Sequence, residues 1–412
     1  MSYLMSLVGM GVLLAVAFAL SNNRKAINYR TVGGAFAIQF SFGAFVLYVP
    51  WGKDLLKGAS DGVTAVINYG MDGSQFLFGT LASDKSFGAM LAFVILPTLI
   101  FFSSLISVLY HWGIMQWVIR ILGGALSKAL GTSRAESMSA AANIFVGLTE
   151  APLVVKPFLS KMTESELFAV MCGGLASIAG GVLAGYASMG VPVNYLVAAS
   201  FMAAPGGMLF AKILRPETAT PDNSIPQIEE IHGELPENLI DAAATGAGFG
   251  LKLALNVAAM LIAFISLIAL LNGLLGEAGA LCGHDNLTLQ QLLGWVISPV
   301  AFLLGVPWSE AHIAGALIGE KIIATEFVAY AHFVEYMGDS SSIVLSEKTK
   351  GIITFALCGF ANIASIAILV GGLGGLAPSR RKDIARLGVL AMIAGTLSNL
   401  MSATIAGFFL SF

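Results

Sequence analysis

Residues 143–152 carry the groups best suited to chemistry in an otherwise apolar part of the chain. Asn143 supplies an amide, Thr149 a hydroxyl and Glu150 a carboxylate, and Gly147 and Pro152 lie among them. A carboxylate in apolar surroundings is costly and therefore marks a candidate functional site. Because glycine loosens a helix and proline removes a backbone donor, we expect the tip of a re-entrant hairpin here, facing a cavity.

A second part of the chain repeats this pattern. Thr149-Glu150 recurs as Thr325-Glu326, and a glycine-led element follows each pair, GLASIA at 174–179 and GFANIA at 359–364. The separations within the two copies differ, which indicates a diverged repeat with an insertion. Two interpretations of the glycine-led elements stay open. Small residues permit close helix packing, and an unwound helix offers carbonyl, hydroxyl and amide oxygens, such as those of Ser177 and Asn362, to a cation.

Composition places the whole chain in a bilayer. Of the 412 residues 57% are hydrophobic and 11% are charged, and the mean hydropathy is +0.84. Such a low charge content excludes an ordinary soluble protein, and a formal net charge of −3 suggests no nucleic-acid partner. The three cysteines, Cys172, Cys282 and Cys358, are too few for a disulfide framework and are expected to be small core residues.

Apolar runs and basic residues predict the topology. The predicted spans cover 3–20, 31–49, 90–114 (extending past Trp117), 168–189, 195–214, 240–275, 351–373 and 387–412, with interfacial helices within 51–87 and 287–300. Residues 3–20 lack the basic segment and cleavage site of a signal peptide. All eight arginines then fall on one side, which the positive-inside rule makes cytoplasmic, and both termini lie outside.

The remaining polar stretches are predicted to be two hairpins, 136–168 entering from the cytoplasm and 301–336 from outside. Secondary transporters build midplane sites from inverted repeats of this kind. The predicted fold is an all-α polytopic membrane protein with about eight transmembrane helices, two opposed re-entrant hairpins in an inverted repeat, and interfacial helices.

Three stretches in this order resemble the concentrative nucleoside transporter family: Gly147–Leu153 (GLTEAPL), Glu326–Tyr330 (EFVAY) and Gly359–Ser365 (GFANIAS). The resemblance covers nearly the whole chain, at the length of the bacterial members. It implies a homotrimer in the bacterial inner membrane whose subunits have a scaffold part and a mobile transport part. Scaffold helices and an interfacial helix are then expected in 1–134, a first transport repeat in 135–215, a loop, long scaffold span and interfacial helix in 216–297, and a second transport repeat in 298–412. It also implies that nucleosides such as uridine are imported by symport with sodium or, in some members, with protons.

The resemblance also implies roles for individual residues. The nucleobase would face Leu148, Thr149, Glu150 and Val182, and the ribose would face Glu326, Phe360, Asn362 and Ser365. Sodium would be held by Asn143, Val146, Ser177 and Ile178, partly through backbone carbonyls. The chemistry is suitable, because a buried carboxylate accepts charge-assisted hydrogen bonds from ribose hydroxyls and an apolar face suits a base. The oxygens of Asn143 and Ser177 favour sodium over protons.

Spacing adds two expectations within this site. Asn362 and Ser365 lie three apart and should share a helical face, and Asn143 and Glu150 would do the same if the first tip were helical. Glu320 and Lys321 are interpreted as a local charge pair.

Two positions depart from the family pattern. Members usually carry Gln or Asn at the position of Leu148, and leucine cannot hydrogen-bond a base. The departure indicates either a substituted and weakened transporter or a natural change in base selectivity. Members often have Asn where this chain has Thr325, whose hydroxyl can compensate.

An intramembrane enzyme and a channel are the two alternative classes of protein. Glu150 and Glu326 could serve as an acid–base pair in an intramembrane enzyme, but the chain has neither an HExxH zinc motif nor a GxSxG elbow. The five histidines show no metal-ligand spacing. A channel would be built from filter loops that meet on an axis, whereas paired inverted hairpins favour alternating access.

Overall fold

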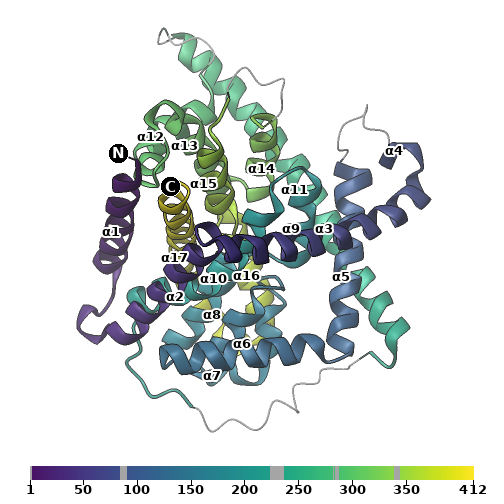
Figure 1. The fold of residues 1–412 in the computed structure, drawn as a ribbon, viewed down its shortest axis with the longest axis vertical. Helices are drawn as coiled ribbons and strands as arrows, with labels where there is room; N and C mark the ends of the chain where they lie inside the picture. Colours follow the sequence, from purple (N-terminus) through teal and green to yellow (C-terminus); the bar gives the residue numbers. More distant parts are fainter. Residues whose placement is uncertain (1, 84–90, 223–235, 282, 284–286, 338–343) are drawn as a thin grey trace.

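The computed structural model describes residues 2–83, 91–222, 236–281, 283, 287–337 and 344–412, and all regular secondary structure in these segments is helical (Figure 1). The helices are α1 Ser2–Leu20, α2 Tyr29–Leu47, α3 Pro50–Phe78, α4 Thr80–Ser83, α5 Leu96–His111, α6 Ile114–Leu130, α7 Arg134–Ala142, α8 Glu164–Ala176, α9 Gly180–Ser188, α10 Val193–Leu214, α11 Leu239–Leu281, α12 Leu289–Leu303, α13 Trp308–Ile323, α14 Glu326–Glu335, α15 Glu347–Leu357, α16 Ile363–Leu376 and α17 Arg381–Phe409. Short 3-10 helices, η1 Arg24–Ala26, η4 Ala151–Phe158 and η6 Pro378–Arg380, and a π-helical segment, Leu91–Ile95, complete the fold.

The membrane-spanning pattern confirms the predicted fold class. Within the described residues, seven helical segments are long and apolar enough to cross a bilayer, and an eighth is added if α12 and α13, bent by 115°, form one broken span. The span expected at 351–373 corresponds to the broken pair α15 and α16, of which only α16 is apolar. Helix α3 crosses the bundle in Figure 1 and exposes Trp51, Tyr69 and Phe76, as an interfacial helix does.

Burial separates the spans into an inner and an outer group. Within the most apolar 18 residues of each span, 94% are buried in α10 and in α8–α9, and 72% are buried in the span that contains α17. The corresponding shares are 17% in α11, 22% in the α5 span, 28% in α1 and 33% in α2. The inner group therefore packs against protein on all sides, while the outer group offers apolar side chains to its surroundings.

Several boundaries differ from the sequence-based expectation. The first hairpin was expected to continue to residue 168, but α8 already begins at Glu164, and two further differences concern where a helix starts. The third span does not extend past Trp117, because the chain turns at Gly113, which has a φ of +76°, and α6 begins as a separate helix at Ile114. The Met90 start of that span lies outside the described residues. The second hairpin begins at Trp308 rather than at residue 301, since α12 continues to Leu303.

The two hairpins enter the bundle from opposite ends. Hairpin 1 consists of α7, an irregular tip at 143–150 and η4, and hairpin 2 consists of α13 and α14. Figure 1 shows α7 near one end of the bundle and α12–α13 near the other, beside both termini. The rings of Tyr3 and Phe412 confirm that the termini meet, since their centroids are 5.8 Å apart.

A buried ion pair fastens hairpin 1 to the inner helices. The Lys212 ammonium on α10 lies 2.6 Å from Glu136 Oε2 on α7 and donates a hydrogen bond of 2.9 Å to Ser165 Oγ on α8. Glu136 also closes a capping box with Ser133, which defines the start of α7. Hairpin 1 is thereby joined to α8 and α10 at its base.

The local charge pair expected for Glu320 and Lys321 does not form among the described residues, and Glu320 instead links hairpin 2 to α12. Glu320 accepts a bond of 3.1 Å from Gln290 Nε2 and lies 2.8 Å from His332 Nδ1. Lys321 donates elsewhere, to Ala356 O and to Asn399 Oδ1. Adjacent residues of a helix project about 100° apart, so the two charges serve different neighbours.

Replacing Lys212 by Met leaves the Glu136 carboxylate buried without its cation. We expect a loss of roughly 3–5 kcal/mol in stability, because breaking one half of a buried pair strands the other charge. Thermal unfolding in detergent measures the effect. The double variant Glu136→Gln/Lys212→Met should recover part of the loss, whereas Lys350→Met, which removes the partner of the largely exposed Glu347, should change little. Equal melting temperatures for wild type and Lys212→Met would contradict this assignment.

Candidate functional site

The tip of hairpin 1 is held by backbone contacts. Glu150 Oε2 accepts a hydrogen bond of 3.2 Å from Gly147 N, and Phe145 O accepts one of 2.9 Å from Gly180 N at the start of α9. The tip is not helical, so the expectation that Asn143 and Glu150 share a helical face is wrong. Asn143 is instead the C-terminal cap of α7.

The four residues expected at the sodium position are all buried where hairpin 1 meets the break between α8 and α9. Asn143 and Val146 belong to the tip, and Ser177 and Ile178 belong to the break at 177–179. Among the described residues, neither Oδ1 nor Nδ2 of Asn143 has a hydrogen-bond partner. A buried amide without partners is costly, so this oxygen is suited to a ligand that the chain itself does not supply.

Hairpin 2 presents its acid in a closed network. Thr325 caps α14, with its hydroxyl accepting from Val328 N at 3.4 Å. Glu326 Oε1 accepts a bond of 3.0 Å from the Tyr186 hydroxyl, and Glu326 Oε2 accepts one of 2.8 Å from Asn362 Nδ2. Asn362 caps α16 by accepting from Ser365 N at 2.8 Å. Asn362 and Ser365, three residues apart, thus form the N-terminal cap of α16.

The two helix breaks touch each other. Phe360 N, in the break at 358–362, donates a hydrogen bond of 3.1 Å to Ser177 O in the break of α8–α9. Both glycine-led elements of the sequence are therefore unwound, as one of their two interpretations required. Their contact brings the second repeat's Phe360 and Asn362 beside the first repeat's predicted ion ligands.

The residues predicted to face a base divide into two groups. Leu148 packs against Gly174 of α8, where an added side-chain carbon would lie 3.0 Å from Leu148 Cβ. Thr149 lies against Gly372 of α16, and Val182 is buried in α9. Only Glu150 among the predicted substrate residues lines the cavity described next.

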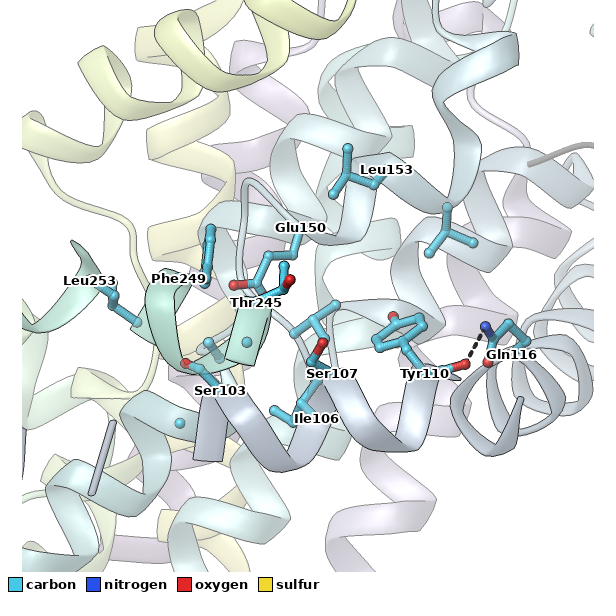
Figure 2. Close-up of a pocket in the computed structure, with 15 residues that line it drawn as sticks. Ser103, Ile106, Ser107, Tyr110, Gln116, Glu150, Leu153, Thr245, Phe249 and Leu253 are labelled. Carbon is cyan, nitrogen blue, oxygen red and sulfur yellow. Dashed lines mark hydrogen bonds between the residues drawn. The ribbon is translucent and has the colours of Figure 1, made fainter. Parts of the chain in front are cut away.

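A cavity of about 380 Å³ lies between hairpin 1 and the outer helices α5 and α11. Its volume falls within the range of small-molecule pockets. Figure 2 shows the Glu150 side chain directed toward Thr245 and Phe249 of α11, with Tyr110 farther along α5. Val146 of the predicted ion position also lines the cavity. Glu326 does not, because Tyr186 and Asn362 enclose it.

Sequence reasoning missed Tyr186 and the outer wall of the cavity. Tyr186 lies in a run of glycines and alanines, and a tyrosine in such a run is a visible signal that its hydroxyl requires a partner. No comparable signal marks Thr245 or Phe249, since both lie on a long apolar helix whose packing partner only the fold reveals.

Comparisons with known proteins agree with this architecture. Residues 8–81 match the family model described as Na+ dependent nucleoside transporter N-terminus, and residues 195–407 match the model of its C-terminus. Residues 92–193, which include hairpin 1, match a model described as nucleoside recognition.

Similar proteins cover the whole chain. A transporter of Haemophilus influenzae is 61% identical over 100% of this chain and 98% of its own. Nucleoside permease NupC of Helicobacter pylori is 55% identical over 99% of this chain and 98% of its own. The relatives are transporters and permeases, so we set aside the intramembrane enzyme.

Among solved structures, CNTnw in an inward-facing substrate-bound state has a TM-score of 0.95 and 58% identity, covering 100% of this chain and 98% of that one. Variants of CNTnw, including one with asparagine replaced by leucine, are described in outward-facing and intermediate states.

Tyr186→Phe removes the hydroxyl that donates to Glu326. Leaving a buried carboxylate oxygen without its donor should lower stability by about 1–3 kcal/mol, which thermal unfolding in detergent would detect. Tyr195→Phe, which removes a hydroxyl from α10 outside this network, is the matched control. If both variants unfold at the wild-type temperature, the Tyr186 hydroxyl does not support Glu326.

Proposed function

Because the chain belongs to the concentrative nucleoside transporter family, we propose that it imports nucleosides such as uridine by sodium symport through alternating access. One observation carries the proposal. The acidic tips of two opposed hairpins converge on two unwound helices that are joined by the Phe360–Ser177 hydrogen bond. Secondary transporters place substrate and ion at such a junction of broken helices.

The ribose is assigned to the second repeat. Glu326 and Asn362 form a hydrogen-bonded pair, and Ser365 and Phe360 lie on either side of Asn362 in sequence. Ribose hydroxyls can replace the donors that Glu326 now holds, forming charge-assisted bonds in the same place. A site built in this way rejects analogues without those hydroxyls, because a buried carboxylate would then lack a donor.

The base is assigned to the first repeat. Leu148, Thr149 and Glu150 belong to the tip of hairpin 1, where Glu150 reaches the cavity, and Val182 is buried in α9. Glu150 can accept from an N–H edge of a base, and Leu148 and Val182 offer apolar contact.

Sodium is assigned to Asn143, Val146, Ser177 and Ile178. The support is the unpartnered Asn143 amide beside an irregular backbone, since hard cations favour several oxygen ligands. The second candidate is coupling to protons. The observation that favours it is Glu150, which, within the described part of the chain, forms no ion pair with a basic side chain.

Alternating access would move the buried inner helices with the hairpins past the outer helices. The contrast in burial between α8–α10 and α11 supports this division into transport and scaffold parts, as do the several states described for CNTnw. The assembly is assigned as a homotrimer in the bacterial inner membrane on family resemblance. The end that carries Arg215, Arg380 and Arg386 is assigned to the cytoplasm and both termini to the outside.

Labelled uridine uptake into proteoliposomes tests the function. With an inward sodium gradient we expect uptake above the external concentration, and with potassium in place of sodium we expect little. Asn143→Leu should abolish the sodium effect by removing a ligand oxygen, while uridine binding at saturating sodium is weakened rather than lost. Absence of both uptake and uridine binding in the wild type would overturn the substrate, and uptake driven by protons alone would overturn the ion.

Leu148→Asn tests the departure from the family pattern. Leu148 is buried against Gly174 and cannot bond a base edge, whereas an amide there could contribute about 0.5–1.5 kcal/mol. We expect uridine KM to fall severalfold in the same uptake assay. Leu148→Met, which keeps the side chain apolar, serves as the control. An unchanged KM in the Asn variant would show that position 148 does not read the base.

A further inference from the structure

Lys321 is an almost completely buried ammonium group, with 1% of the residue exposed. It lies on α13, the first helix of hairpin 2. Its Nζ donates a hydrogen bond of 2.8 Å to Ala356 O in the last turn of α15 and one of 2.7 Å to Asn399 Oδ1 on α17. Neither acceptor is a carboxylate, so the lysine is held by neutral oxygens, as a bound cation would be.

Asn399 extends this contact to both helix breaks. Its Nδ2 donates bonds of 2.6 Å to Ala176 O and of 2.8 Å to Cys358 O. Ala176 ends α8 and Cys358 follows α15, so one amide joins the last carbonyls of both broken helices. A side chain at Gly359 would collide with the Asn399 amide, which explains the glycine there.

The charge of Lys321 matches its surroundings. The carboxyl-terminal ends of α8 and α15 carry partial negative charge, and cations near such ends are favoured. Glu326 uses its two oxygens on Tyr186 and Asn362, and Asn362 belongs to the break that follows α15, whose last turn Lys321 contacts. The ammonium group thus compensates the helix ends beside the acid of hairpin 2.

Within the described residues, the acid at the tip of hairpin 1 has no equivalent ammonium partner. Glu150 receives a hydrogen bond from Gly147 N, and no basic side chain in the described segments forms an ion pair with it. Asn143 nearby keeps both amide atoms unpartnered. The two repeats therefore differ in how charge is supplied: from within the chain at hairpin 2, and from outside it at hairpin 1.

We propose that the Lys321 ammonium, oriented by Asn399, acts as a built-in cation at the second helix break, so that one sodium ion is coupled rather than two. The inference rests on the proposed sodium symport. Lys321 is a positioning residue in this scheme, because it sets the field and the geometry at Glu326 and Asn362 without touching substrate.

The first test needs no variant. The initial rate of uridine uptake by the wild type is measured in proteoliposomes at saturating uridine as sodium replaces choline at constant ionic strength. A single ion should give a Hill coefficient of about 1, since the coefficient cannot exceed the number of coupled sites. A coefficient of about 2 in the wild type would overturn the proposal.

Lys321→Ala is the second test. It leaves the oxygens of Ala356 and Asn399 around a space that a cation can enter. We expect low stability in choline, recovery in sodium, and a Hill coefficient rising toward about 2. The matched control is Glu136→Gln/Lys212→Met, which removes another buried lysine without leaving bare oxygens and should keep the wild-type sodium response. A folded Lys321→Ala protein with the wild-type response would contradict the proposal.

Lys321→Gln decides the question if the alanine variant does not fold in either salt. Glutamine can still donate to Ala356 O or Asn399 but carries no charge. We expect uridine KM to rise at least tenfold in sodium-driven uptake, and an unchanged KM would refute the built-in cation. Failure of the proposed function is distinguishable, because wild-type uptake would then ignore sodium altogether.

Discussion

Backbone groups inside a bilayer cannot be left to water, and this constraint governs the centre of the structure. Two inner helices are broken at 177–179 and 358–362, and each break frees carbonyl and N–H groups where solvation is unavailable. Hydrogen bonds within the chain satisfy these groups. Phe360 N donates to Ser177 O, and the Asn399 amide donates to the carbonyls at the ends of α8 and α15. The two hairpin tips, their acids and the cavity lie around this contact between the two helix breaks.

The division of labour between the repeats follows from the same constraint. At the second repeat, Asn362, Lys321 and, from α9 of the first repeat, Tyr186 satisfy the acid and the helix ends from within the chain. In the first repeat Asn143 and Glu150 are left with few internal partners. This arrangement suits a site in which the second repeat holds its acid in a fixed geometry and the first repeat changes its contacts when a ligand binds.

Much of this arrangement was predictable from residue types. Glu150 and Glu326 marked both tips because carboxylates are costly in apolar surroundings, and the repeated GLASIA and GFANIA elements marked both breaks. Local patterns failed where the answer depended on distant partners. Lys321 was expected to pair with its neighbour Glu320, but its acceptors come from α15 and α17, and no spacing rule connects position 321 to Asn399. The helical face assumed for Asn143 and Glu150 was lost because glycine and proline unwind the tip.

The place of Asn399 on the last helix has a consequence for biosynthesis. The carbonyls of Ala176 and Cys358 receive their side-chain donor only when α17, Arg381–Phe409, has been made and has entered the bundle. Until then both broken helices carry unsatisfied polar groups, which are costly in hydrocarbon. The hydrogen bonds at the two helix breaks are therefore completed only by the last helix, and a chain that ends before Asn399 would lack the donor for both carbonyls.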